Sequence, residues 1–290
     1  MPATFERTFR VRHYECDAFG HLNPVNYVRY MQEVALDASA DVGWDRARYS
    51  ALGYGWLARE TRITYLHPVA RDEHLTIKTW VEDFRRVRSW RRYEFRRVGD
   101  DKLLAKASTE WIYMHVASGK PATIPPEMIH DFHPEGSPPP GESRNKFPSA
   151  PTESDEIFTL EKRVAWADID TEAHLNNAAY LTYLEDASTQ VSRHYGWLMA
   201  QLMAAGFMLM PREFQILYLL PGYMDDALQI RTWGGVFEWA TTTRYYEIVR
   251  PADEATLARA HSTWLCVDLK TGQLRQFPAE YVAAMKPNTH

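Results

Sequence analysis

A carboxylate and an imidazole stand four residues apart at two places in the chain, Asp17 with His21 and Asp170 with His174. A carboxylate can attack a carbonyl carbon or take a proton from a water molecule. Each pair lies just ahead of a segment that predicts a helix, and a helix start can stabilise a carbonyl oxygen as it becomes an oxyanion. The two pairs therefore indicate chemistry on a carbonyl group.

The segments that follow the pairs have the signals of a helix. Asn23 and Asn176 are favoured helix-capping residues, and Pro24 suits the first helical position. Apolar residues then recur at three- and four-residue spacing as far as Gly43 and Gly196, where each helix is expected to stop. A polar pair ahead of a helix is also a common structural cap, and that alternative stays open.

The two pairs belong to a repeat that runs through most of the chain. Matching residues lie 153 positions apart. A period this long indicates a duplicated domain, because solenoid repeats run at roughly 20–50 residues. Polar residues kept in both copies mark the first place to look for chemistry. Adding 153 to a number in the first copy gives the matching residue in the second for Asp17, His21, Asn23, Tyr27, Tyr30, Arg59, Glu60, Tyr65, Trp80, Glu94, Trp111 and Pro125.

Each copy is expected to contain the same elements in the same order. A short strand at 5–14 or 157–166 precedes the helix, and four more strands follow it, in the first copy at 57–66, 74–84, 89–98 and 103–115. One helix with consecutive strands is an α+β pattern with an antiparallel sheet. A stretch rich in Pro, Gly and Ser at 133–152 is expected to be a linker between domains 1–132 and 153–290.

Composition limits the classes of function. The net charge of −5 gives no reason to expect nucleic-acid binding. The two cysteines, Cys16 and Cys266, have no metal-type spacing and favour a reducing compartment. We find no apolar leader, and the longest apolar stretch is shorter than the roughly 20 residues of a membrane span. We therefore expect a cytoplasmic protein without membrane, metal or cofactor.

The Asp–His segment resembles the hotdog-fold acyl thioesterase superfamily. Asp17, Gly20, His21, Asn23 and Tyr27 match its Asp-x-x-Gly-His-x-Asn pattern with a following Tyr. The second copy, residues 166–180, resembles the catalytic half of acyl-carrier-protein thioesterases, which are also tandem hotdogs. The resemblance implies a long helix on an antiparallel sheet in each copy, and a dimer of hotdog units fused into one chain. It implies acyl-CoA or acyl carrier protein as substrate carrier, and leaves further homo-oligomerisation open.

The resemblance also implies roles for individual residues. Asp17, Asp170 or both would act as nucleophile or general base, while His21 and His174 orient or polarise the thioester. Backbone N–H groups near Gly20 and Ala173 would contribute to the oxyanion hole. Glu172 stands where the carrier-protein thioesterases have Asn, which is a departure from their pattern. Their downstream acidic residue falls at Glu247, with Glu94 as its duplicate; a solvated strand residue is the structural alternative for both.

Arginine is concentrated in one strand of the first copy. Seven arginines lie between residues 85 and 97, whereas the matching stretch keeps Arg244 and Arg250. CoA phosphates and acidic carrier proteins are both anionic, and arginine suits such groups. We expect carrier docking at Arg88, Arg92 and Arg96, unless these side chains only pair with neighbouring carboxylates.

Two other functions share the predicted fold. Hotdog hydratases carry Asp-x-Asn-Pro-x-His, whereas in this chain Asn23-Pro24 follows the histidine. A non-catalytic acyl-CoA-binding protein would have little reason to keep the acidic residues in both copies. Hydrolysis of acyl-CoA or acyl-carrier-protein thioesters is therefore the favoured function, with these two as alternatives.

Overall fold

The structure is a computed structural model that describes residues 1–136, 147–150 and 156–289. The chain divides into two compact units, unit 1 (Met1–Lys146) and unit 2 (Phe147–His290). Much of the predicted linker 133–152 lies outside the described residues. His133, at its predicted start, is only 1% exposed, and its ring lies 5.7 Å from that of Phe84. The packed part of unit 1 therefore extends past residue 132.

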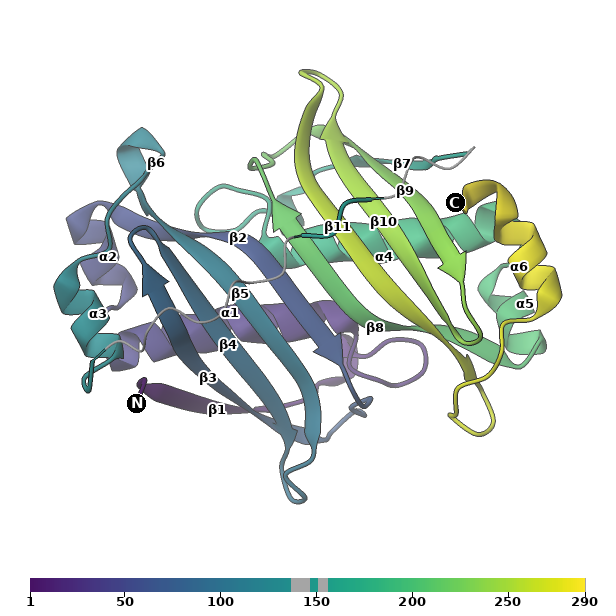
Figure 1. Cartoon of the computed structure of the whole chain (residues 1–290), viewed down its shortest axis with the longest axis horizontal. Helices are drawn as coiled ribbons and strands as arrows, with labels where there is room; N and C mark the ends of the chain where they lie inside the picture. The colour runs from purple at the N-terminus through teal and green to yellow at the C-terminus, as the bar shows by residue number, and fades with distance from the viewer. Residues whose placement is uncertain (137–146, 151–155, 290) are drawn as a thin grey trace. The chain divides into compact units, whose positions relative to one another are not determined.

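Unit 1 is an antiparallel sheet with one long helix across a face, drawn from purple to teal in Figure 1. Its strands are β1 (Thr4–Arg10), β2 (Tyr54–Tyr65), β3 (His74–Arg85), β4 (Arg88–Arg97), β5 (Leu103–His115) and β6 (Lys120–Pro121). Their order is β1-β3-β4-β5-β2, and β6 pairs with β5. The helices are α1 (Pro24–Asp41), α2 (Arg46–Leu52) and α3 (Pro126–Phe132), and 3-10 turns cover His13–Glu15 and Val116–Ser118.

Alternation along β4 decides which side chains meet the helix. Arg91, Tyr93 and Phe95 are buried, and the Phe95 ring lies 5.2 Å from the Tyr27 ring of α1. Successive residues of a strand point to opposite faces of its sheet. Arg92, Glu94 and Arg96 alternate with these buried residues and therefore face away from α1.

Unit 2 repeats this architecture. Its strands are β7 (Phe158–Arg163), β8 (Phe207–Tyr218), β9 (Ala227–Phe237), β10 (Thr241–Arg250) and β11 (Ala255–Asp268). They follow the order β8-β11-β10-β9-β7, with antiparallel neighbours. The helices are α4 (Asn177–His194), α5 (Met199–Ala204) and α6 (Ala279–Met285), and 3-10 turns cover Trp166–Asp168 and Lys286–Asn288.

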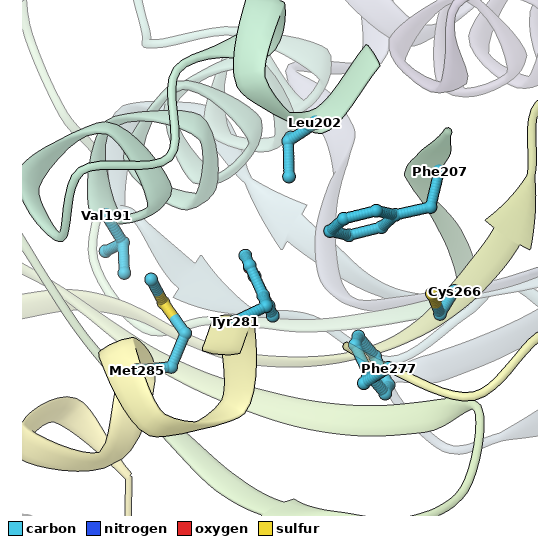
Figure 2. Close-up of a cluster of buried hydrophobic side chains, with 7 residues drawn as sticks. All are labelled: Val191, Leu202, Phe207, Cys266, Phe277, Tyr281 and Met285. Atoms are coloured by element: carbon cyan, nitrogen blue, oxygen red, sulfur yellow. The ribbon is translucent and has the colours of Figure 1, made fainter. Parts of the chain in front are cut away.

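Buried side chains from α4, α5, α6, β8 and β11 form a hydrophobic cluster in unit 2 (Figure 2). Val191 of α4 and Tyr281 of α6 converge there with Phe207 of β8, and each is at most 3% exposed. Tyr281 also hydrogen-bonds Ser192 of α4 at 3.1 Å between the two hydroxyl oxygens. The end of α4 is thereby fixed to α6. Leu202, Cys266, Phe277 and Met285 complete the cluster.

The predicted α+β fold, a long helix on an antiparallel sheet in each of two copies, is confirmed. Helix α1 begins at the predicted Pro24, and β5 has the predicted bounds. The first strands are shorter than predicted, because residues 13–15 and 166–168 turn into 3-10 helices. The short helices were not predicted. Asp45 and Gly53 do bracket α2 as N-cap and left-handed C-cap, but seven residues are too few for a helical period to stand out.

Both cysteines are free thiols. Burial raises the pKa of the Cys266 thiol to about 11, which keeps it in the unreactive protonated form. Of the helices within the described ranges, none is long and apolar enough to cross a membrane.

Candidate active site

In unit 1 the Asp17–His21 segment is a closed loop that fixes one carboxylate oxygen. Asp17 Oδ1 accepts hydrogen bonds from the backbone N–H groups of Phe19 at 2.8 Å and His21 at 3.1 Å. The Asp17 N–H donates to the His21 carbonyl oxygen at 2.8 Å. Oδ2 of Asp17 makes no hydrogen bond to any part of the chain that the structure describes, so one oxygen is anchored while the other remains available for chemistry.

Unit 2 repeats this geometry at Asp170. Oδ1 accepts from the N–H groups of Glu172 at 2.9 Å and His174 at 3.3 Å. The Asp170 N–H donates to the His174 carbonyl oxygen at 2.9 Å. Both aspartates are half-buried, whereas Glu172 is exposed. The structure therefore places Asp and His of each predicted pair in one loop, and adds Glu172 to the second loop.

The predicted supporting asparagines are the caps of the long helices. Asn23 Oδ1 accepts from the Val25 N–H, and Asn176 Oδ1 accepts from the Ala178 N–H, each at 2.9 Å. The helices so fixed begin at Pro24 and Asn177, three residues after the histidines. These side chains are thus occupied in the fold, and the asparagines act on the site by setting where the helix begins.

The predicted oxyanion donors at Gly20 and Ala173 need correction. The Gly20 N–H donates to the Asp17 carbonyl at 3.1 Å, and the Ala173 N–H donates to the Asp170 carbonyl at 3.0 Å. Both residues have positive φ, 78° and 60°, as the turn requires. Because both N–H groups close the turns, neither is available to bind a carbonyl oxygen.

The two histidines have different surroundings. His21 is half-buried, and its Nδ1 atom is buried without a hydrogen-bond partner among the residues described. The His174 ring packs edge-on against Tyr223, with 5.5 Å between ring centroids. In both loops the histidine backbone is hydrogen-bonded to the aspartate, through its N–H group to Oδ1 and through its carbonyl oxygen to the aspartate N–H.

Just before each Asp–His loop, a carboxylate accepts a hydrogen bond from a tyrosine of the long helix. The sequence did not predict a role for these pairs. The Tyr30 hydroxyl donates to Glu15 Oε2 at 2.6 Å, and the Tyr183 hydroxyl donates to Asp168 Oδ2 at 2.7 Å. Burial, and then the hydrogen bond to the carboxylate, raises the pKa of both tyrosines. Each pair ties the residue two before the aspartate to the long helix. The retention of Tyr30 as Tyr183 was the signal in the sequence.

Glu94 and Glu247 do not join the loop of their own unit. Glu94 lies on β4, on the face opposite α1, and pairs with Arg96 at 2.9 Å. Glu247 lies on β10 beside Tyr246, whose hydroxyl group meets Ser188 of α4. It therefore also faces away from the long helix, and it pairs with Arg259 at 3.0 Å. Within a unit both act as ion-pair partners on a sheet face.

The arginines predicted to dock a carrier are ion-paired. Each has a carboxylate from the same or a neighbouring part of the sheet, so the excess of positive charge in the sequence is largely compensated in the fold. The pairs are Arg88–Glu110 at 3.1 Å, Arg92–Glu82 at 2.9 Å, Arg96–Glu94 at 2.9 Å and Arg96–Asp101 at 3.1 Å.

Within the described ranges, no group of three or more His, Cys, Asp or Glu side chains is placed to hold a metal ion. The chemistry that the loops themselves offer is that of a half-buried carboxylate with one free oxygen, next to an imidazole and a helix start. This set can activate water or attack a carbonyl carbon.

Comparison with known proteins points to one family. A family model described as the thioesterase-like superfamily matches twice, at residues 11–132 and 164–285. The acyl-CoA thioester hydrolase YbgC of Escherichia coli O157:H7 is 28% identical over 130 residues, which are 45% of this chain and 96% of YbgC.

Two solved structures resemble the whole chain. The 12:0-ACP thioesterase of Umbellularia californica has a TM-score of 0.72 at 16% identity, covering 91% of this chain and 97% of that one. An acyl-ACP thioesterase of Bacteroides thetaiotaomicron has a TM-score of 0.69 at 18% identity, covering 90% and 97%. At these identities the likeness establishes a shared tandem hotdog fold.

Proposed function

The chain belongs to the thioesterase-like superfamily, and on that basis we propose that it hydrolyses acyl thioesters to a free acid and a thiol. The observation that carries the proposal is the duplicated loop. In each copy two backbone N–H groups hold Oδ1 of the aspartate and Oδ2 has no hydrogen bond within the described residues, in a loop that also contains a histidine and precedes a long helix.

The chemistry follows from the free oxygen. Oδ2 of Asp17 or Asp170 takes a proton from a water molecule, and the resulting hydroxide attacks the thioester carbonyl carbon. The carbonyl oxygen becomes an oxyanion, which the positive end of the helix stabilises. The C–S bond then breaks, and the carboxyl group returns its proton to the thiolate. Direct attack by the carboxylate gives an anhydride that water hydrolyses to the same products.

Substitution of the aspartates tests this proposal. Asn has the shape of Asp and can still accept the two backbone hydrogen bonds, but it is neither a base nor a nucleophile. We expect the combined Asp17→Asn and Asp170→Asn variant to keep its fold and to lose roughly 10²–10⁴-fold in kcat. Thiol release from panels of acyl-CoA and acyl-ACP substrates of different chain length measures this. Undiminished turnover in the double variant would refute the proposed role.

The carrier is part of the same proposal. YbgC is described as an acyl-CoA hydrolase, and the Umbellularia californica enzyme as an ACP thioesterase, so both carriers belong in the panel. YbgC corresponds in length to one unit, and we propose that the duplication holds two such units in one chain as an intramolecular counterpart of a dimer. A cytoplasmic location remains a prediction from the sequence.

A further inference from the structure

The residues that surround the two Asp–His loops differ in charge, although the loops themselves match. Residues 12–13 lead into the loop of unit 1, and residues 70–71 lie beside it, since the Arg71 N–H donates to the Gly20 carbonyl at 3.2 Å. Residues 165–166 and 223–224 hold the matching positions in unit 2. The basic residues of unit 1, Arg12, His13 and Arg71, correspond to Ala165, Trp166 and Met224.

The backbone around the loop does not require these basic side chains. Glu15 accepts from the Arg12 N–H at 2.7 Å, and the matching Asp168 accepts from the Ala165 N–H at 3.2 Å. Unit 2 therefore closes the same 3-10 turn with alanine, because the donor is in the backbone. The turn after Arg71 is also shared, with φ 68° at residue 72 and 66° at residue 225. The positive charge on the unit 1 loop is thus an addition to the fold.

Carboxylates hold these arginines loosely. Asp72 lies 3.4 Å from both Arg10 and Arg71, and Arg12 lies 3.1 Å from Glu15. The three arginine side chains are between 55% and 63% exposed, whereas the two arginines of β4 that pair at 2.9 Å are 38% and 35% exposed. Ion pairs between exposed side chains contribute little. An anionic ligand can therefore replace the carboxylates at a small cost.

A cavity lies against the same segment of unit 1. Its volume is about 580 Å³, and residues 7–14 of β1 and the following turn line it. Sites for small molecules have volumes of roughly 300–1,000 Å³, whereas a protein partner needs about 800 Å² of surface on each side. Tyr14 lines the cavity and is 77% exposed, so its ring offers a face on which a nucleotide base can stack. The size, charge and aromatic ring fit a nucleotide.

We infer that this cavity and the arginines around it, Arg10, Arg12 and Arg71, bind the phosphorylated adenosine of CoA. The choice of ligand rests on the proposed function, and it makes acyl-CoA rather than acyl-ACP the substrate. The guanidinium groups donate to phosphate oxygens in place of the carboxylates, and the Tyr14 ring stacks on the adenine. Of these three arginines unit 2 keeps one, Arg163, so each chain binds one nucleotide.

Arg12→Ala with Arg71→Met is the test variant, because unit 2 already folds with these residues; circular dichroism and the urea midpoint check its fold. Titration with 3′-phosphoadenosine 5′-phosphate measures binding without turnover. We expect one site per chain in the unmodified protein, and a Kd about 10–100-fold higher in the variant. KM for acyl-CoA should rise by a similar factor, whereas KM for an S-acyl pantetheine, which has the same acyl group but no phosphate, should not.

Arg92→Gln with Arg96→Gln is the matched control, because it removes the same charge from β4 of the same unit. We expect it to leave the nucleotide Kd within about threefold of that of the unmodified protein. An equal loss of nucleotide affinity in both variants would mean that net charge alone attracts the ligand, and it would overturn the assignment to the cavity.

The other outcomes separate the nucleotide site from the proposed function. Unchanged nucleotide affinity in the test variant, with acyl-CoA still hydrolysed by the unmodified protein, would overturn the site alone. A rise in KM for acyl-ACP but not for acyl-CoA would also overturn it, because a protein would then occupy these arginines. An equal rise for S-acyl pantetheine would do the same, since the substitutions would then act on the Asp17 loop itself. Nucleotide binding without thiol release from any substrate would support the site and refute the proposed function.

Discussion

Tyr93 of unit 1 and Tyr246 of unit 2 are buried at matching positions on β4 and β10, but their hydroxyl groups have different partners. The Tyr246 hydroxyl lies 2.8 Å from both Ser188 Oγ and Ser262 Oγ, and Trp264 Nε1 donates to Ser262 at 2.6 Å. In unit 1 the matching residues are Ala35 and Thr109 in place of the two serines. Tyr93 Oη lies near Thr109 and Trp111 without hydrogen-bond geometry to either, and Trp111 Nε1 is also unpaired among the described residues.

The buried arginines of the two sheets also differ in their polar partners, and again the residue in unit 2 makes more hydrogen bonds than its counterpart in unit 1. Arg244 Nη1 donates to Asn288 Oδ1 at 2.7 Å and to Thr232 at 3.4 Å. Arg91, at the matching position, donates to Thr79 at 3.4 Å and lies over the Phe132 ring at 5.5 Å. Burial lowers the pKa of both guanidinium groups. The comparison teaches that duplicated units keep the size and shape of buried side chains more strictly than their polar partners.

The largest effect that tests this comparison is expected from the two tyrosines. Tyr246→Phe removes the hydroxyl group that hydrogen-bonds Ser188, Ser262 and, at 3.4 Å, Trp264, and should lower the free energy of unfolding by about 3 kcal/mol. Tyr93→Phe removes a hydroxyl group that has no hydrogen-bond partner among the described residues, so it should be neutral or stabilising by about 1 kcal/mol. Urea denaturation followed by circular dichroism measures both variants. Each is the control for the other, because the atom removed is the same.

Equal destabilisation by these two substitutions would contradict the comparison. It would mean that Tyr93 is satisfied in solution, for example by an ordered water molecule that bridges it to Trp111. A buried water needs two to four polar partners, and Tyr93, Trp111 and Thr109 could supply them. The sign of the Tyr93→Phe effect therefore decides whether unit 1 tolerates an unpaired group or uses water in its place.

The hydrogen-bonded pairs Glu15–Tyr30 and Asp168–Tyr183 give a second, smaller contrast. Here the hydrogen bond in unit 1 is expected to stabilise the fold more than the one in unit 2. Glu15 is 6% exposed, whereas Asp168 is half-buried, although each also accepts from a backbone N–H group, that of Arg12 at 2.7 Å and that of Ala165 at 3.2 Å. A buried carboxylate that loses a donor is poorly compensated by water. We expect Tyr30→Phe to lower the free energy of unfolding by about 2 kcal/mol and Tyr183→Phe by about 1 kcal/mol. The same urea experiment measures both, and a larger loss from Tyr183→Phe would contradict the role of burial.

Local signals predicted much of the fold, and the rest depends on strand register. Asn23-Pro24 specifies the helix start because an Asn cap and a proline at the first position each act within a few residues. Both aspartate loops were found because a four-residue spacing is local. The engagement of the Gly20 N–H was not predicted, because it follows from the positive-φ turn that the loop adopts.

The arginine strand shows the limit of reading charge from sequence. Seven arginines in thirteen residues suggest a basic surface, yet alternation turns Arg91 inward, where it contacts Thr79 and the Phe132 ring. The partners of Arg88 and Arg92 come from β5 and β3, and only the strand register brings Glu110 and Glu82 to them. Those contacts join residues ten or more positions apart, so composition alone could not reveal that the charges are paired.

The smallest expected effect concerns the same arginines and carrier docking. A carrier phosphate or carboxylate would have to compete with Glu82 for Arg92 and with Glu94 for Arg96, and partly exposed ion pairs of this kind contribute little, about 0–1 kcal/mol. We expect Arg92→Gln with Arg96→Gln to raise KM by less than about threefold for both acyl-CoA and acyl-ACP, with kcat unchanged. Glu82→Gln with Glu94→Gln is the matched control, because it removes the Glu82 carboxylate from Arg92 and the Glu94 carboxylate from Arg96, which keeps Asp101 as a partner. A rise in KM above tenfold in the arginine variant, with a fall in KM in the glutamate variant, would show that the carrier does dock at β4 and that the carboxylates hold the arginines in place for it.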